Sequence, residues 1–332
     1  MLSDNPYFQL LRIPNIFTVP PDIILGYLIA LSSVQLVNLS SIGYNLPNMF
    51  ILVISSISLY LGGLVSNDLF DTRTDMIERP SRPLPSGKVQ KKYAYILLVF
   101  FFGTGFSLSL LLNSVAVGIS SLLIISILIY NYKLKNGIWR PFLMGGIRAL
   151  NIVYGFSILF SFSDQYFDMT VLDIIRENIV EMHSNMLLLL VLFSIFFHIF
   201  VLTFVSSRET AREFNSNSNK KKFNIKIILY AYTIFLFMIG WLGLYLLEFK
   251  TSYIFFVLVL GVIVIMIFYQ AHLRMLHLEV SLKMQFIVKN MIVLLILLDS
   301  AFISGISGPL VGIATAFLIL PSFLLSKKIS MT

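Results

Sequence analysis

The residues best suited to chemistry gather in one segment, Asn67 to Lys88, which reads NDLFDTRTDMIERPSRPLPSGK. On a continuous helix, Asp68, Asp71 and Asp75 are spaced by three and four residues, so their carboxylates share one face. Asn67 adds an amide oxygen beside them. Three like charges repel one another, and Mg²⁺ relieves that repulsion through a few carboxylates while leaving room for phosphate oxygens and water. The segment predicts a magnesium site with three catalytic aspartates and Asn67 as a further ligand.

Basic side chains follow the aspartates directly, at Arg79, Arg82 and Lys88. Guanidinium groups are suited to bidentate contact with phosphate. Three prolines within residues 80–85 end the helix and stiffen the turn that carries these cations. We therefore expect the metal to hold a diphosphate. A solvated loop that only sets membrane topology is the plainer alternative, but it leaves the spacing of the carboxylates unexplained.

The surrounding sequence predicts helices that cross a membrane. Of its 332 residues, 58% are hydrophobic and 12% charged, and the mean hydropathy is +0.89. A soluble domain would carry about twice that charged fraction. Because backbone groups in lipid must pair within their own segment, we expect an all-α, multi-pass membrane helix bundle of nine to ten transmembrane helices. The apolar runs lie at about 16–38, 48–66, 93–112, 115–132, 141–161, 185–205, 226–246, 252–270, 288–306 and 308–326.

The charges between these runs indicate the orientation. Lysine and arginine concentrate in alternate loops, which by the positive-inside rule places the acidic segment in the cytoplasm. The formal charge of +8 is therefore interpreted as a topology signal, and nucleic acid is not an expected partner. We expect an integral protein of the plasma membrane, in contact with membrane lipid. The chain has no cysteine, which excludes disulfides and thiolate metal sites.

No segment between the runs is long enough for a soluble domain, so we expect a single transmembrane domain over residues 1–332. The two longest polar segments both begin with a Val-Ser pair, at residues 65 and 205. This echo suggests two halves, about 16–135 and 141–270, followed by extra C-terminal helices at about 288–326.

The stretches NDLFDTRTD and RPSRPLPSG resemble the first aspartate motif, and the sequence after it, of the UbiA superfamily of intramembrane prenyltransferases. Arg12 and Asn15 in LLRIPNIFT resemble the entry to the first helix of that family. Tyr130 and Lys135 resemble its tyrosine–lysine motif with altered spacing. The stretch MGGIRALN and the ending LLDSAFISG through LILPSFLL are similar to a narrower branch, the EboC-like proteins.

This resemblance implies a helical bundle around a central cavity, with Mg²⁺ held by two acidic motifs. It also implies an isoprenyl diphosphate donor whose polyprenyl group passes to a small aromatic or lipid acceptor. The second motif departs from the family pattern and reads SSRETAREFNSNSNKKK. Glu209 and Glu213 are one helical turn apart and are the expected second metal ligands, and Arg208 and Arg212 are expected to hold phosphate.

Ionisable groups inside apolar runs are also candidates, because burying them in hydrocarbon is costly. Arg148 in the fifth run is as consistent with diphosphate or acceptor contact as with a structural ion pair, and Asn151 is expected to share its face. His198 in the sixth run is expected to hydrogen-bond between helices. The complete set of expected substrate-binding residues is Asn15, Arg79, Arg82, Lys88, Lys135, Arg148, Asn151, Arg208 and Arg212.

Two other functions stay open at this stage. A non-catalytic UbiA-like protein, acting in transport or as a partner of a membrane complex, would explain the altered second motif. An ion or proton carrier would instead use Asp22, Arg148 and Asp299, the ionisable residues of three apolar runs.

Overall fold

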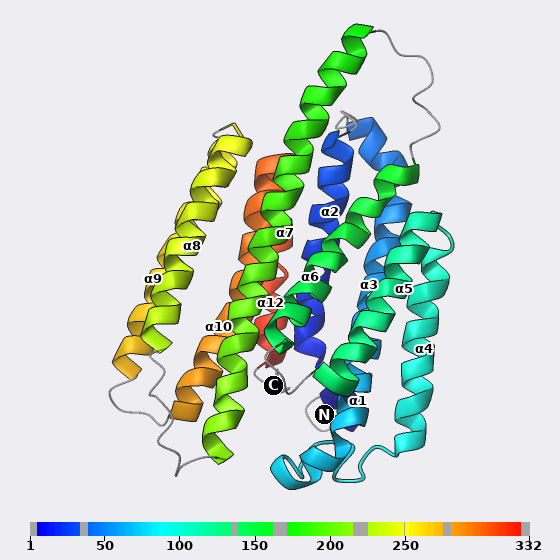
Figure 1. The fold of residues 1–332 in the computed structure, drawn as a ribbon, viewed down its shortest axis with the longest axis vertical. Coiled ribbons are helices and arrows are strands. Elements are labelled where there is room, and N and C mark those ends of the chain that lie inside the picture. Colours follow the sequence, from blue (N-terminus) through cyan, green and yellow to red (C-terminus); the bar gives the residue numbers. More distant parts are fainter. Residues whose placement is uncertain are drawn as a thin grey trace. The chain divides into compact units, whose positions relative to one another are not determined.

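The computed structural model describes residues 5–33, 39–134, 139–161, 171–214, 225–248, 250–274 and 280–326, and those residues form helices and no strand (Figure 1). This confirms the expected all-α membrane fold. Within the described residues, seven helices are long and apolar enough to cross a membrane: Ile13–Ser33, Leu46–Glu78, Lys91–Ser109, Ser114–Tyr132, Arg140–Phe160, Ser184–Ser206 and Phe286–Ser307. Three shorter apolar helices are Tyr230–Leu246, Thr251–Ile267 and Pro309–Leu325. Together the seven long and three shorter helices correspond to the ten predicted runs.

The helices form two compact units. One contains Met1–Gly137, Leu150–Ser184 and Phe317–Thr332, and the other contains Ile138–Ala149 and Asn185–Ala316. Helix α6 (Arg140–Phe156) and helix α7 (Val171–Phe214) each contribute to both units. The grouping reflects contacts between helices, so the internal halves expected from the sequence remain a prediction.

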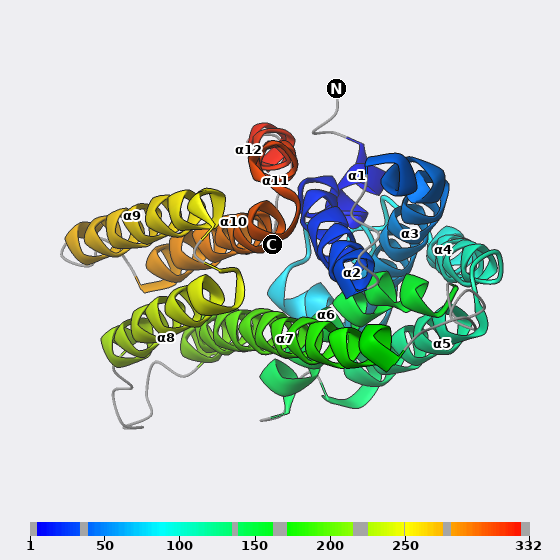
Figure 2. The ribbon, with the colours of Figure 1, turned by 90° about the horizontal axis from the view of Figure 1, so that it is seen from above.

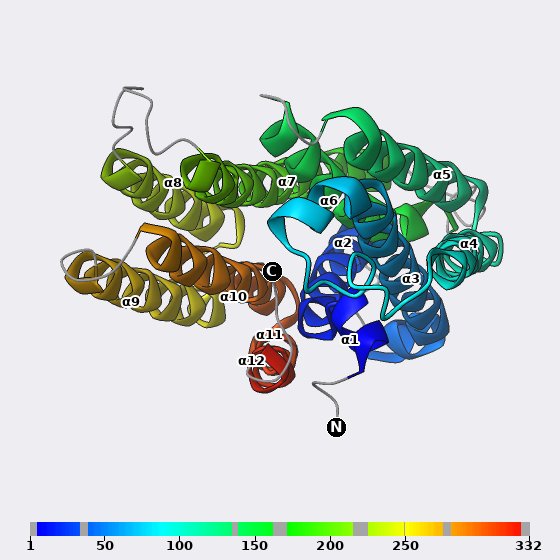
Figure 3. The same ribbon diagram turned by 90° about the horizontal axis from the view of Figure 1, so that it is seen from below.

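The first unit is organised by α3 (Leu39–Glu78), which packs against α2 and α4. At 1.5 Å per residue, the 40 residues of α3 extend about 60 Å, roughly twice the thickness of the hydrocarbon core. The acidic segment occupies its C-terminal turns and therefore lies at one edge of a span. The other elements are α1 (Pro6–Leu10), η1 (Ile13–Thr18), α2 (Val19–Ser33), α4 (Lys91–Ser109), α5 (Ser114–Ile129), the π turn η2 (Tyr130–Leu134), η3 (Ser157–Ser161) and α12 (Ile319–Ser326). Figure 3 shows α1 beside α3.

The second unit contains α8 (Ile225–Leu246), α9 (Thr251–Arg274), α10 (Val280–Ser307) and α11 (Pro309–Ala316), together with parts of α6 and α7. Helix α10 packs against α9 and α11, as Figure 2 shows from above. His198 of α7 is fully buried and joins two other helices through its ring nitrogens. Nε2 lies 2.9 Å from the Met291 carbonyl oxygen, and Nδ1 lies 2.6 Å from the Tyr232 hydroxyl. The expected interhelical role of His198 is confirmed.

Glycine allows α2 and α6 to approach closely within the first unit. A Cβ atom placed on Gly26 would collide with the Ile152 carbonyl oxygen, and one on Gly155 would collide with the Ile23 carbonyl oxygen. Small residues at such crossings let helix backbones touch and gain van der Waals contact in lipid. These two glycines therefore set the distance between the helices.

We expect Gly26→Ala to destabilise the protein by about 1–3 kcal/mol, because the added methyl group meets backbone rather than a flexible side chain. The measurement is unfolding of the purified protein in mixed micelles. Gly118→Ala is the matched control, because a Cβ atom there meets nothing within 4 Å. Equal stability of the two variants would contradict the proposed close packing at Gly26.

Candidate functional site

Two aspartates of the predicted site are buried at the end of α3. Asp68 and Asp75 are each 4% exposed, although an ionised carboxylate pays a large penalty when it leaves water. Arg82 compensates both: its Nη1 donates to Asp75 Oδ2 at 2.7 Å and lies 3.6 Å from Asp68 Oδ1. One arginine therefore contacts two carboxylates that are two helical turns apart. The contact agrees with the shared face expected from their spacing.

The proline-containing turn brings Arg82 to α3. After α3 ends, the Arg79 amide donates to the Asp75 carbonyl oxygen at 2.9 Å, and the Arg82 amide donates to the Arg79 carbonyl oxygen at 3.1 Å. Leu84 and Val89, farther along the same turn, are buried in an apolar cluster with Val65 of α3 and Ala94 of α4. The turn is thus anchored by apolar side chains, and its arginine points back to the acidic face.

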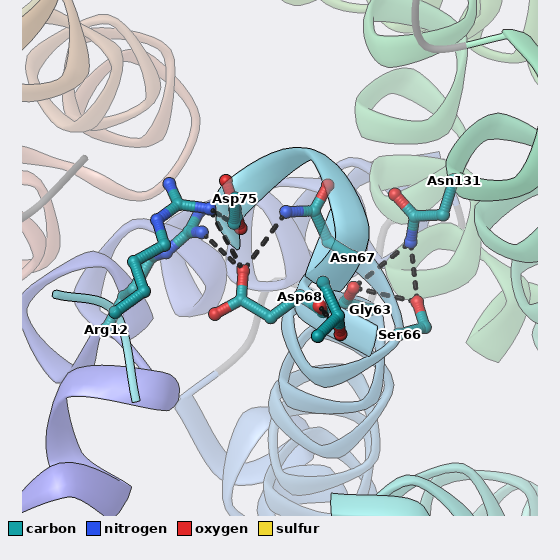
Figure 4. A network of polar contacts seen from close by, with 9 residues as sticks. Arg12, Gly63, Ser66, Asn67, Asp68, Asp75 and Asn131 are labelled. Atoms are coloured by element: carbon teal, nitrogen blue, oxygen red, sulfur yellow. Dashed lines mark hydrogen bonds and ion pairs between the residues drawn. The ribbon is translucent and has the colours of Figure 1, made fainter. Parts of the chain in front are cut away.

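Arg12, which the sequence analysis did not place in the site, is the second cation. It lies between α1 and η1, and its Nη2 donates to Asp68 Oδ1 at 2.8 Å (Figure 4). The Nδ2 of Asn67 approaches the same oxygen at 3.3 Å. The two arginines and the two aspartates carry equal and opposite charge. The acidic pattern alone could not identify Arg12, because 56 residues separate it from Asp68.

Asn131 is a second residue that the sequence analysis missed. It lies in the π turn after α5, and its buried Nδ2 donates to the Gly63 carbonyl oxygen at 3.1 Å and to Ser66 Oγ at 2.5 Å (Figure 4). These contacts hold α3 immediately before the acidic segment. π turns occur often at functional sites, and Asn131 here fixes the helix that carries the aspartates.

The donor chemistry of this site fits Mg²⁺. Asp68, Asp71, Asp75 and Asn67 offer oxygen ligands, and Mg²⁺ is commonly bound by one or two carboxylates together with phosphate and water. Within the described residues, no three acidic, histidine or cysteine side chains come close enough to form a ready metal cage. Arg12, Arg82 and Asn67 instead contact the carboxylates. The arrangement therefore suits a cation that arrives with its own anionic ligand.

The other predicted residues of this segment surround the buried pair. Asp71 on α3 and Arg79 in the turn are half-buried, and each has a polar or charged interaction. Lys88 is exposed and follows Gly87, whose φ of 74° is readily adopted by glycine. Asn15 is buried in η1, and its backbone amide donates to the Arg12 carbonyl oxygen at 2.9 Å.

The structure gives Asn151 a different neighbourhood. Its Nδ2 donates to Asp22 Oδ2 at 3.1 Å, and its Oδ1 accepts from Ser56 Oγ at 2.5 Å. Ser56 precedes Asp68 by 12 residues, which is roughly 18 Å along a helix. Asn151 therefore links α2, α3 and α6 well away from the aspartates, and its substrate contact stays a prediction.

The remaining predicted residues belong to the second unit or lie outside the described residues. Arg148 belongs to the second unit, where its side chain is half-buried and has an interaction partner. Lys135 lies outside the described residues. The backbone of residues 208–213 continues α7, which agrees with a helical second motif. The side chains of Arg208, Glu209, Arg212 and Glu213 lie outside the described residues.

Comparison with known proteins identifies the family. The profile of the UbiA prenyltransferase family matches residues 24–290. The chain belongs to the UbiA prenyltransferase family. The chain spans about half the length of the curated relatives it matches. One of them, the digeranylgeranylglyceryl phosphate synthase of Saccharolobus solfataricus, is 35% identical over 161 residues, which are 48% of this chain and 54% of that protein.

Solved structures of UbiA proteins share the fold. One, described as a digeranylgeranylglyceryl phosphate synthase in membranes, has a TM-score of 0.58 at 21% identity and covers 92% of this chain and 99% of its own. A UbiA homologue from Archaeoglobus fulgidus, solved with DMAPP and Mg²⁺, has a TM-score of 0.51 at 13% identity. That match covers 91% of this chain and 99% of the homologue. The resemblance to the UbiA superfamily is confirmed, and the EboC-like branch stays a prediction.

The Asn131–Ser66 contact can be tested by a double-mutant cycle. We expect Asn131→Leu to destabilise this UbiA protein by about 1–3 kcal/mol, because buried acceptors on α3 lose their donor. Ser66→Ala removes one of these acceptors, so the two substitutions together should cost less than their sum, with a coupling of about 1 kcal/mol. Unfolding in mixed micelles provides the measurement. Additive costs would show that the two side chains do not interact.

Proposed function

We propose that this UbiA protein is a Mg²⁺-dependent intramembrane prenyltransferase that transfers a polyprenyl group from an isoprenyl diphosphate to a lipid acceptor carrying a glyceryl phosphate headgroup. The observation that carries the proposal is the buried pair Asp68 and Asp75 on one face of α3, with Arg82 in contact with both. Arg12 and Arg82 balance the two carboxylates in the absence of ligand. A buried cluster of acidic and basic groups at the end of a membrane span also suits a cation and an anion that bind together.

The residues of α3 would bind the metal, and those of the proline-containing turn would bind the diphosphate. Asp68, Asp71 and Asp75 would hold Mg²⁺ with Asn67, and the bound cation would supply stabilisation of the negative charge that develops on the departing diphosphate. Arg79, Arg82 and Lys88 would contact the diphosphate oxygens directly. Fixed cations in a site with little water stabilise a leaving anion best, because they need no rearrangement during the reaction. The buried position of Asp68 and Asp75 supports this mechanism.

The acceptor follows from the chemistry in the name of the related synthases. A product with two geranylgeranyl groups on one glyceryl phosphate arises when a hydroxyl oxygen of a monoprenylated glyceryl phosphate attacks C1 of a prenyl diphosphate. The carbon–oxygen bond to diphosphate breaks, the carbon–oxygen bond to glycerol forms, and the hydroxyl proton leaves. The synthase of Saccharolobus solfataricus is 35% identical to this chain over 161 residues, which supports a related acceptor. We therefore favour the lipid acceptor over the aromatic one.

The second acidic segment and the orientation belong to the same proposal. Glu209 and Glu213, one turn apart on α7, would bind a further Mg²⁺, and Arg208 and Arg212 would contact phosphate. The distribution of lysine and arginine supports a cytoplasmic position for the acidic end of α3 in a plasma-membrane protein. Lys135, Arg148, Asn15 and Asn151 complete the proposed substrate contacts.

Asp71→Asn should lower turnover by at least about a hundredfold, because the amide keeps the shape of the carboxylate and removes the charge that attracts Mg²⁺. The measurement is diphosphate release from geranylgeranyl diphosphate by the protein in lipid nanodiscs. Glu78→Gln is the matched control, because Glu78 is an exposed carboxylate on the same helix. Full turnover by the Asp71 variant would overturn the proposed role of the first motif.

Mass spectrometry of the reaction products tests the acceptor. We expect a diprenylated lipid when geranylgeranylglyceryl phosphate is supplied, and no prenylated product from a hydroxybenzoic acid. A prenylated aromatic acid without a lipid product would contradict the proposed acceptor. The absence of diphosphate release with every acceptor, despite binding of the donor, would favour the non-catalytic alternative.

A further inference from the structure

We propose that Arg12 is a built-in counter-ion which competes with a divalent cation for Asp68, and this inference rests on the proposed metal site. The guanidinium of Arg12 donates to Asp68 Oδ1 at 2.8 Å. A cation bound to Asp68 would need oxygen lone pairs of the same carboxylate. Because both groups are positive, a cation that approaches Oδ1 must displace Arg12 or weaken its contact.

Arg12 is the main partner of Asp68 within the described residues. Arg82 is held more closely by Asp75, at 2.7 Å, than by Asp68, at 3.6 Å. Asn67 contributes a neutral donor at 3.3 Å. Removal of Arg12 would therefore leave Asp68 with the distant Arg82 and a weak amide contact. That carboxylate is almost completely buried, so its affinity for another cation should rise.

The backbone of Arg12 has a conformation that arginine seldom adopts. Its φ of 41° and ψ of 54° lie in the left-handed region, which residues other than glycine seldom adopt. Such a conformation persists where the surrounding structure determines it, and it is found often at functional sites. The strained residue is also the one that supplies the guanidinium to Asp68.

The neighbours of Arg12 explain how this conformation is maintained. Leu10, two residues earlier, is fully buried in the apolar cluster with Val65, Leu84 and Val89. Three residues later, the Asn15 amide bonds to the Arg12 carbonyl oxygen. The same cluster also anchors the turn that carries Arg82. The segments that carry Arg12 and Arg82 therefore both pack into one apolar cluster next to α3.

A purely structural role is the alternative. In that case the Arg12–Asp68 pair would fasten the N-terminal segment, and its loss would lower stability without changing cation affinity. Competition predicts that loss of Arg12 makes divalent cations bind more tightly. A purely structural role predicts no such change in affinity. Cation affinity, measured without substrate, separates the two roles.

The test uses Mn²⁺, an oxygen-seeking cation that electron paramagnetic resonance detects, with the full chain in nanodiscs. Arg12→Met should bind Mn²⁺ about tenfold more tightly than the unchanged protein, since tenfold corresponds to the loss of one charge-assisted hydrogen bond. Arg12→Lys keeps the charge but lacks the planar fork, and it should show an intermediate affinity. Lys92→Gln, which removes an exposed charge at the start of α4, should leave the affinity unchanged.

The outcomes separate this inference from the proposed function. Mn²⁺ binding by the unchanged protein, with equal or weaker binding by Arg12→Met, would overturn the competition and leave the metal site standing. No Mn²⁺ binding by any variant would overturn both. Should Arg12→Met fail to fold, Arg12→Lys decides, because tighter binding than in the unchanged protein supports competition and equal binding contradicts it.

Discussion

The first unit depends on the electrostatic compensation of two carboxylates that are removed from water. Asp68 and Asp75 would repel each other and lose hydration if they stood alone at the end of α3. Their partners, Arg12 and Arg82, come from segments on either side of α3 in the chain. The N-terminal segment and the proline-containing turn must therefore both fold onto one end of this helix. The apolar cluster around Leu10 and Leu84 supplies the packing that makes this arrangement stable.

Helix α3 also carries polar contacts along its length. Ser55 donates to the Gly105 carbonyl oxygen at 2.7 Å and shares a hydrogen bond with Tyr154. Ser56 bonds to Asn151, and Ser66 bonds to Asn131. Each of these groups would be costly to leave unpaired in a membrane. The neighbouring helices are thus joined to α3 by specific polar pairs in addition to apolar packing, and α3 is held in one rotational setting about its axis.

The parts of this architecture that depend on local spacing could be predicted from the sequence. Ten apolar runs correspond to helices because length and hydropathy determine membrane insertion, and the aspartates share a face because they lie three and four residues apart. The pairs Arg12–Asp68 and Asn131–Ser66 could not be predicted, since 56 and 65 residues separate their members. No helical period relates such distant positions. Resemblance to the family singled out Arg12, but only the folded chain shows which carboxylate it contacts.

The π turn at Tyr130–Leu134 has a consequence for how the sequence can change. A π turn closes over one more residue than an α turn, so it absorbs a single-residue insertion within a helix. Asn131, inside that turn, is tied to Gly63 and Ser66. Helix α5 can therefore keep its register on α3 while the number of residues between the turn and Lys135 changes. Such tolerance agrees with a tyrosine–lysine spacing that departs from the family pattern.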